Sequence, residues 1–213
     1  MIDTTDQIDA IHREVERRSV DGDEVVSVLL RRAYGASVQD VWSAVTDPER
    51  IARWFMPVSG DLREGGDFQL QGNAGGRILR CDPPRMLRAT FGGETSIVEV
   101  RLTPDGNDST TLELEHTVPM EMAGSGAGAL FVGPGWDGAV MGLGLYLSGA
   151  FTGDPVEAAN SPEVIAFNGA SIGKWTSVVE ASGTATTEEL AAGVAASRAQ
   201  FTPDADPSDQ RDR

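Results

Sequence analysis

The sequence is poor in the residue types that build disulfides and metal sites. It has one cysteine, Cys81, among 213 residues, and two histidines, His12 and His116. A single cysteine excludes a disulfide within the chain, and so few thiol and imidazole groups leave no ligand set at metal spacing. We therefore predict no metal and no cofactor. The cysteine content also fits a reducing compartment, so we expect a cytoplasmic protein.

Positive charge is scarce as well. The chain carries 17 Lys and Arg against 33 Asp and Glu, a formal charge of −16. Nucleic acids and anionic membrane surfaces are bound through clustered Lys and Arg, so we expect neither as a partner. Only one basic residue is a lysine, Lys174, which is the bias of a GC-rich bacterial genome.

Long apolar runs are absent too. The charged N-terminus has no apolar segment of the kind that a secretory signal contains. The longest apolar candidate, residues 127–151, is interrupted by repeated glycines and by Pro134, and no run reaches the ~18 residues of a membrane span. We therefore predict no membrane insertion.

The N-terminal residues have a helical pattern. Ile8, Ile11 and Val15 recur at helical spacing among charged residues, which predicts a helix over residues 4–19. An Asp-Gly-Asp turn then ends an N-terminal helical segment of residues 1–22. Its narrow apolar stripe would lie on a domain surface or on a partner.

A strand and two short helices come next. Residues 24–34 are rich in β-branched side chains and are interpreted as the first strand of a sheet. Ser37 is placed to cap a helix over residues 38–45, and Asp47 with Pro48 starts a second helix that ends near Trp54.

Six strand-like runs follow, and the turn residues between them predict an antiparallel meander. The runs are residues 58–63, 67–71, 77–81, 86–91, 95–102 and 110–118. In the last run Leu112, Leu114 and His116 alternate with Glu113 and Glu115, so one face of the sheet is apolar and the other is wet.

The second half of the chain is helical. Residues 120–135 are rich in Gly and Ala, and we predict no element there before Trp136, where a long helix begins. The glycines of this helix allow close packing on the sheet or leave room for a ligand, and both readings are open. Residues 164–181 and 188–201 are predicted helices, and the Pro-broken tail of residues 203–213 is predicted to be disordered.

This order of elements resembles the helix-grip fold of the SRPBCC superfamily, which includes START lipid-binding domains, polyketide cyclases and the birch-pollen allergen. The phrases YGASVQDVWSAVTDPERIARWF, GGRILRCDPPRMLRATF and GWDGAV are similar, in this order, to the branch of heat-shock-protein-90 ATPase activator homologues. The resemblance implies an α+β fold in which a curved antiparallel sheet wraps around a long C-terminal helix, with extra terminal helices. It assigns residues 23–153 to a helix-grip domain and residues 154–202 to a C-terminal helical extension like that of some bacterial members.

In this fold a cavity lies between the sheet and the long helix, and the resemblance places several large side chains beside it. His116 could point into this cavity and orient or deprotonate a ligand, or it could be a core histidine bonded to the backbone. The expected ligand-binding residues are Trp54, Phe68, Phe91, His116, Trp136 and Met141.

Other polar residues can be interpreted either as functional groups or as ordinary structural residues. Glu113 and Glu115 could serve acid–base work or form the wet face of a strand. Arg80 and Arg88 could hold a ligand carboxylate, or pair with glutamates of neighbouring strands. Cys81 has no local base or helix N-terminus to make it nucleophilic, so we interpret it as a structural thiol.

Three functions are compatible with these patterns. The first is binding of one small, mostly apolar molecule without turnover. The second is an enzyme of the polyketide cyclase or dehydratase type, with His116 as the candidate catalytic residue beside an Arg or Glu. The third is a co-chaperone or another protein-binding module that uses the terminal helices, which also give a homodimer a place to form.

Overall fold

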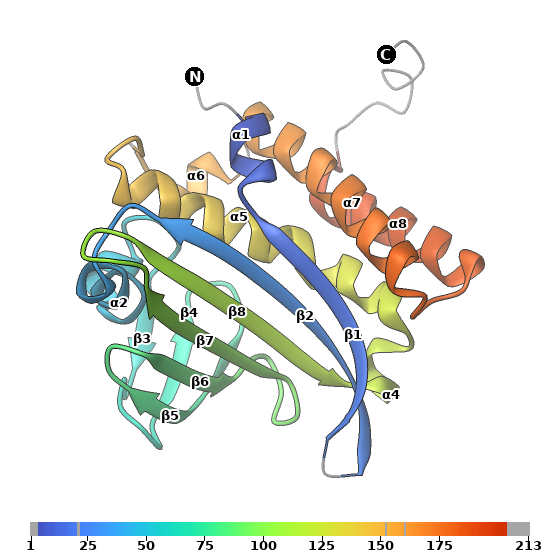
Figure 1. Ribbon diagram of the computed structural model, residues 1–213, viewed down its shortest axis with the longest axis horizontal. Coiled ribbons are helices and arrows are strands. Elements are labelled where there is room, and N and C mark those ends of the chain that lie inside the picture. The colour runs from blue at the N-terminus through green and yellow to red at the C-terminus, as the bar shows by residue number, and fades with distance from the viewer. Residues whose placement is uncertain (1–3, 21, 152, 160, 204–213) are drawn as a thin grey trace.

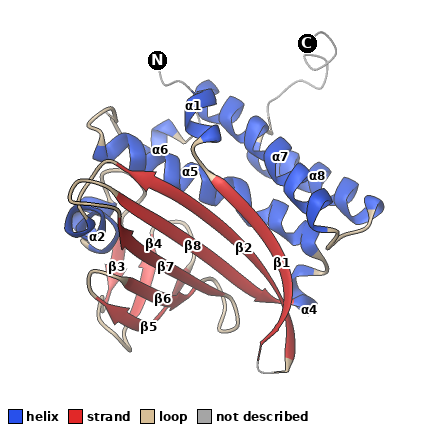
Figure 2. Ribbon diagram, in the orientation of Figure 1, coloured by secondary structure: helices blue, strands red, loops and turns tan. Residues whose placement is uncertain are grey.

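The computed structural model contains one curved sheet with helices against one face (Figures 1 and 2). It describes residues 4–20, 22–151, 153–159 and 161–203. The predicted α+β class and the helix-grip arrangement are confirmed. The predicted disordered tail lies, from residue 204 onward, outside the described residues.

The sheet has eight strands in the order β1-β2-β8-β7-β6-β5-β4-β3, and every neighbouring pair is antiparallel. The strands are β1 (His12–Val20), β2 (Asp23–Tyr34), β3 (Val58–Gly60), β4 (Asp67–Leu70), β5 (Gly75–Asp82), β6 (Met86–Thr90), β7 (Ile97–Pro104) and β8 (Thr110–Pro119). The meander predicted from the turn residues is therefore present, and the long crossover from β2 to β3 carries two helices.

The helices flank this sheet. They are α1 (Thr4–Asp9), α2 (Val38–Thr46), α3 (Pro48–Ile51), α4 (Met120–Ala123), α5 (Ala129–Leu147), α6 (Pro155–Ala158), α7 (Pro162–Ser182) and α8 (Thr187–Phe201), with a 3-10 turn η1 (Gly126–Gly128) before α5. Figure 1 shows α5 crossing behind the sheet, with α7 and α8 beyond it on the side of β1.

The core lies between the sheet and α5. On β2 and β8 the inward residues Leu30, Leu112 and Leu114 are almost completely buried, because alternation along a strand sends every second side chain to the same face. Val140 and Leu143 of α5 are buried against this face. Burial of these aliphatic side chains is the main favourable contribution to folding here.

The two helices of the crossover begin as the sequence predicts. Ser37 accepts a hydrogen bond from the Asp40 N–H and caps α2. Asp47 accepts one from the Glu49 N–H and caps α3, with Pro48 at the first helical position. Arg50 of α3 donates to the Asp40 carboxylate, so this ion pair ties the two short helices together.

The predicted N-terminal helix of residues 4–19 is wrong beyond Asp9. Residues 12–20 form the edge strand β1, so the strand over residues 24–34 is the second in the chain. Side chains 11, 13 and 15 are all buried, which is a strand period, but the middle one is Arg13. An arginine is normally expected on a solvated face, so Arg13 hides the alternation of buried residues along β1. Its partner Asp137 lies 124 residues away in the chain, and no local pattern reveals the pair.

The long helix begins earlier than predicted. The chain is helical from Ala129 and passes through Pro134, so the predicted start at Trp136 is wrong. The N-terminal part of α5 packs between the sheet and α7, where tertiary burial overrides weak intrinsic propensity. A Cβ on Gly133 would come within 2.5 Å of the Trp175 ring, so this glycine permits the close approach of α5 and α7.

The two predicted C-terminal helices are present and pack on the same core. Phe167, Trp175 and Val179 of α7 are fully buried and belong to the hydrophobic cluster that includes α5. Thr186 caps α8 and exchanges hydrogen bonds with Glu189 in a capping box. The division into a domain of residues 23–153 and an extension of residues 154–202 stays a prediction.

A buried polar cluster joins β1, α5 and α7. Asp137 of α5 is fully buried and accepts two hydrogen bonds from Arg13 Nε, at 3.1 and 2.9 Å. Ser171 Oγ and Trp175 Nε1 of α7 also donate to Asp137 Oδ2, at 2.5 and 3.1 Å. Arg13 in turn donates to the carbonyl of Ile11, at 2.7 Å. The carboxylate is therefore matched by three donors from two other elements, with the single Arg13 Nε–H shared between its two oxygens.

Removing one member of this cluster should destabilise the protein strongly. Arg13→Met keeps a long side chain but leaves the Asp137 carboxylate buried without its counter-ion, which costs about 3–5 kcal/mol of unfolding free energy. The matched control is Arg17→Met, which breaks the exposed 2.9 Å pair with Glu24 and should cost less than about 1 kcal/mol. Urea unfolding of the three proteins measures both values. Equal losses in the two variants would show that the cluster does not hold the fold together.

Candidate functional site

An apolar cavity lies between the inner face of the sheet, α5 and the α2–α3 segment. Its volume is about 220 Å³ and its wall is overwhelmingly apolar. Leucine, isoleucine and valine side chains of β4 to β8 form the sheet side, and α5 contributes Ala139, Val140 and Leu143. Leu62 and Arg63 of the β3–β4 loop line its exposed end, where the Arg63 side chain is 79% exposed.

Five aromatic side chains line this cavity from four parts of the chain. The segment after α3 supplies two of them, and β4, the end of β6 and α5 supply the rest. They are Trp54, Phe55, Phe68, Phe91 and Trp136. Trp54 and Phe55 are stacked with ring centroids 5.5 Å apart, and Phe91 and Trp136 lie 5.1 Å apart. Aromatic faces of this kind suit flat apolar molecules.

The indole and hydroxyl groups of the described wall residues are already bonded within the protein. Trp54 Nε1 donates to the carbonyl of Ala44 at 3.0 Å, and Thr46 Oγ1 donates to the carbonyl of Trp42 at 2.7 Å. The indole N–H of Trp136 donates to a histidine of β8. The inner part of the cavity therefore offers a ligand no free indole or hydroxyl donor.

His116 holds Trp136 in place from behind the cavity wall. Trp136 Nε1 donates to His116 Nδ1 at 3.0 Å, so Nδ1 carries no proton and the neutral ring keeps its proton on Nε2. That nitrogen then donates to Ser96 Oγ at 2.8 Å. Burial lowers the pKa of His116 to about 4, and both ring nitrogens are engaged. The residue is arranged as a support for the Trp136 ring, without a free nitrogen to act as a base.

The structure divides the predicted ligand-binding residues into two groups. Trp54, Phe68, Phe91 and Trp136 line the cavity. His116 and Met141 are buried but do not line it, because His116 lies behind Trp136 and Met141 is packed in the core cluster. A ligand-binding role for any of the six stays a prediction.

The sequence patterns predicted no aliphatic residue as part of the cavity wall. Leu112 and Leu114 line the cavity, and the alternation along the last strand placed them on the correct face. Val45, Ile51 and Leu62 also line it, but they come from helix ends and a loop whose position depends on the tertiary fold. Nothing in their local sequence distinguishes them from ordinary core residues.

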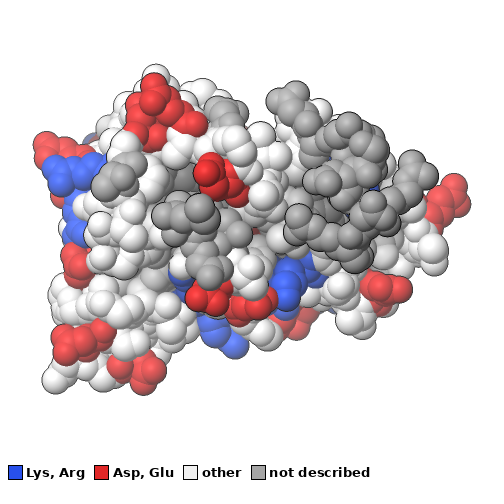
Figure 3. Space-filling model, turned by 90° about the horizontal axis from the view of Figure 1, so that it is seen from above, with Lys and Arg blue, Asp and Glu red and all other residues white. Residues whose placement is uncertain are grey.

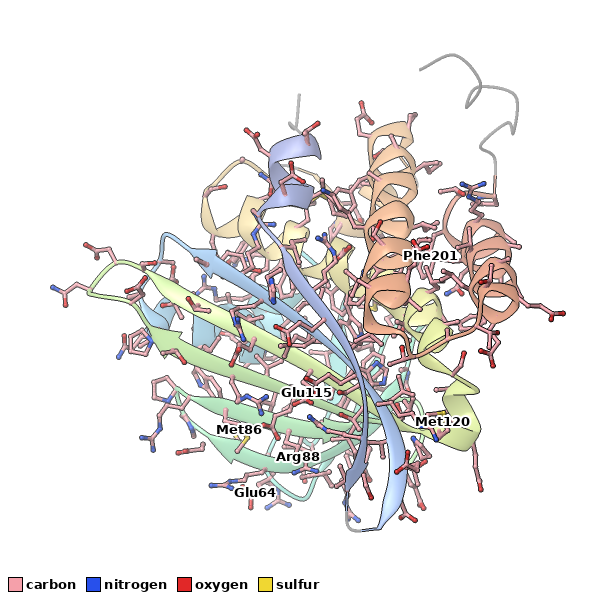
Figure 4. All side chains as sticks on the ribbon, turned by 45° about the vertical axis from the view of Figure 1, so that its right-hand side comes forward. Glu64, Met86, Arg88, Glu115, Met120 and Phe201 are labelled. Atoms are coloured by element: carbon pink, nitrogen blue, oxygen red, sulfur yellow. The ribbon has the colours of Figure 1, made fainter. Side chains whose placement is uncertain are left out.

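The charged residues considered as site candidates lie on the outer face of the sheet. Glu99, Glu113 and Glu115 pair there with arginines of neighbouring strands, and Figure 4 shows Arg88 and Glu115 projecting from this face. Arg88 Nε lies 3.8 Å from a Glu99 carboxylate oxygen, so its pairing interpretation holds. Arg80 is exposed and does not line the cavity.

Cys81 does line the cavity, close to its exposed end. Burial and the nearby carboxylates of Glu64 and Asp82 raise the pKa of this thiol. A raised pKa lowers the thiolate fraction, which is the opposite of what a nucleophilic cysteine requires. The interpretation of Cys81 as an unreactive thiol is consistent with this environment.

Neither a metal cluster nor a membrane span was found in the described part of the chain. Among those residues no three His, Cys, Asp or Glu side chains come together as a metal site would require. None of the described helices is both long and apolar enough to cross a membrane. On the face seen in Figure 3 the basic groups that are described are interspersed with acidic ones and form no continuous patch.

Protonation of His116 should couple stability to pH. The pKa of the buried ring is about 4, below the 6.5 of an exposed imidazole, so the unfolded chain takes up a proton first as the pH falls. The free energy of unfolding is therefore unaffected by His116 above about pH 6.5. Between about pH 6.5 and pH 4 the titration of His116 lowers it by about 3 kcal/mol in total.

His116→Gln provides the comparison, because its amide does not titrate. The difference in unfolding free energy between wild type and variant should shrink by this amount over that interval. Burial raises the pKa of Asp137 to about 6, which gives the opposite slope, but this residue is common to both proteins and cancels in the difference. Parallel pH profiles for the two proteins would contradict the burial of a neutral His116.

Several solved structures are similar to this chain in fold and sequence. The crystal structure of CalU16 from Micromonospora echinospora is 42% identical, with a TM-score of 0.66 over 80% of this chain and 98% of that one. The solution structure of CalU16 gives 42% identity and a TM-score of 0.67, over 81% of this chain and 97% of that one. DynU16, described as a protein of the dynemicin biosynthetic locus, is 28% identical with a TM-score of 0.50, over 61% of this chain and 48% of its own length.

The comparison with protein families is decisive for classification. No curated protein matches the chain. Residues 35–148, which run from the end of β2 to the end of α5 and include the whole cavity wall, match the family model described as activator of Hsp90 ATPase homolog 1-like protein. The chain therefore belongs to the family of Hsp90 ATPase activator homolog 1-like proteins.

Proposed function

We propose that this protein binds one small, mostly apolar molecule in the cavity between α5 and the sheet and does not transform it. The observation that carries the proposal is the chemistry of the cavity wall. Aromatic and aliphatic groups surround the space, and the polar atoms of Trp54, Thr46 and Trp136 are turned into the protein. Cavities of this composition favour apolar ligands.

The size of the cavity limits the ligand. An empty apolar cavity of about 150 Å³ accepts benzene, whereas pockets for drug-sized ligands measure roughly 300–1,000 Å³. At about 220 Å³ the cavity suits a compact group of one or two rings. A larger molecule would extend past Leu62 and Arg63 into solvent, with its polar part at that end.

The alternative is a cyclase or dehydratase acting in the same cavity. Such a reaction needs an acid, a base or an oxyanion donor that reaches the substrate. His116 is occupied at both nitrogens and the Cys81 pKa is raised, so neither residue is arranged for this role. The location of DynU16 in a biosynthetic locus keeps the alternative open, and it also fits a carrier of a biosynthetic small molecule.

A protein-binding role has less support from the terminal segments. The expected N-terminal helix is mostly an edge strand, and the apolar residues of α7 are buried in the core, which leaves fewer free apolar surfaces than the sequence suggested. A homodimer and a cytoplasmic location stay predictions.

The wall chemistry predicts discrimination against hydroxyl groups. Naphthalene should bind, while a dihydroxynaphthalene with one hydroxyl on each ring should bind at least about tenfold more weakly, because each buried hydroxyl without a partner costs about 1–3 kcal/mol. Isothermal titration calorimetry of both compounds measures the ratio. Tighter binding of the hydroxylated compound would indicate polar groups that reach the ligand and would favour the enzyme alternative.

Filling the cavity should abolish binding without unfolding the protein. Ala139 lines the cavity from α5, and Ala139→Phe places a ring in the space that the ligand needs, so naphthalene affinity should fall at least about tenfold. The control is Ala33→Phe, which adds the same ring at an exposed position of β2 and should leave affinity unchanged. Undiminished binding by Ala139→Phe would place the binding site elsewhere.

A further inference from the structure

Arg32 is a buried cation on the inner face of the sheet and does not line the cavity. It lies on β2 between the inward positions of Leu30 and Tyr34 and is only 8% exposed. The last turn of α5 passes directly over it, and a Cβ on Gly144 would come within 2.8 Å of Arg32 Nη2. The glycine therefore makes room for the guanidinium.

The guanidinium has few partners for a group so deeply buried. Nη2 donates to Gln7 Oε1 of α1 at 2.6 Å, and Cζ lies 5.4 Å from the centroid of the Tyr34 ring. Nε and Nη1 are buried and have no hydrogen-bond partner among the described residues. No described carboxylate forms an ion pair with Arg32, and burial lowers its pKa.

Comparison with the buried Arg13 shows that Arg32 has unusually few partners. Arg13 is equally buried, but Asp137 faces it and its Nε, Nη1 and Nη2 atoms all donate hydrogen bonds. A buried charge is costly unless an opposite charge and hydrogen bonds compensate it. Arg32 therefore has donor capacity and positive charge that the described residues do not use.

The hydrogen-bond acceptor of Arg32 is an uncharged side chain close to the surface. Gln7 is half-buried and belongs to the short helix α1, and its amide oxygen is a neutral acceptor on a charged donor. If Gln7 swings outward, an incoming oxyanion can take Nη2 together with the neighbouring Nε or Nη1. Such paired, charge-assisted hydrogen bonds are those that a guanidinium forms best with carboxylate and phosphate groups.

We propose that Arg32 is the base of a small oxyanion-binding site, closed by the side chain of Gln7, that accepts a carboxylate or phosphate group. This site is separate from the apolar cavity, and none of its residues line that cavity. Its existence does not depend on the function proposed for the cavity.

Thermal unfolding of the full chain at constant ionic strength tests the site, with acetate or inorganic phosphate replacing chloride. The wild type should show a saturable rise in Tm of at least about 2 °C with one of the two anions, and the anion that acts distinguishes a planar from a tetrahedral ligand. Arg32→Met should abolish the saturable rise. Arg31→Met is the control, because it removes the exposed neighbouring arginine paired with Glu113 and should leave the rise intact.

A second variant keeps the test decisive if Arg32→Met does not fold. Gln7→Glu places a carboxylate within the chain at the position of the amide oxygen, so it should raise Tm in chloride and eliminate the response to added anion. General salt effects would be equal in all proteins. A wild type without a saturable response, or a Gln7→Glu protein that is no more stable than wild type and still responds, would overturn the proposal.

Discussion

The rest of the structure depends on the buried carboxylate of Asp137. Burial raises its pKa to about 6, while the Arg13 guanidinium opposes that shift, so the group is ionised and paired at neutral pH. Its four hydrogen bonds join the edge strand β1, the long helix α5 and the added helix α7. Because an ionised carboxylate without these donors would be very unfavourable in the core, the three elements are held in one relative position.

This constraint fixes how α5 lies over the sheet. From Asp137 the helix continues with Ala139, Val140 and Leu143 toward the sheet, and these residues form one wall of the cavity. One residue before Asp137, Trp136 is held by His116 through its indole nitrogen. The hydrogen bonds of Asp137 and of the Trp136 indole thus hold α5 in place beside a cavity that is itself apolar. An apolar ligand would bind in this cavity through the hydrophobic effect, without directed hydrogen bonds.

Local sequence patterns predicted the parts of the fold whose signals are local. The caps at Ser37 and Asp47 and the alternation around Leu114 are set by neighbouring residues, and the corresponding elements are where the sequence placed them. The edge strand β1 was misread as a helix, because Arg13 occupies a core position only through its pairing with Asp137. Likewise, four of the five aromatic residues of the cavity could be named, Phe55 being the exception, but no local feature shows that His116 lies behind Trp136.

The most direct test of this account is whether the cavity is an open, dry apolar space in the folded protein. Xenon occupies empty apolar cavities of this kind, so a crystal structure under xenon pressure measures the property without knowledge of the ligand. The account predicts a xenon atom between the sheet and α5, in contact with the rings of Phe91 or Trp136. A cavity collapsed onto these rings, or one filled by hydrogen-bonded water, would contradict it.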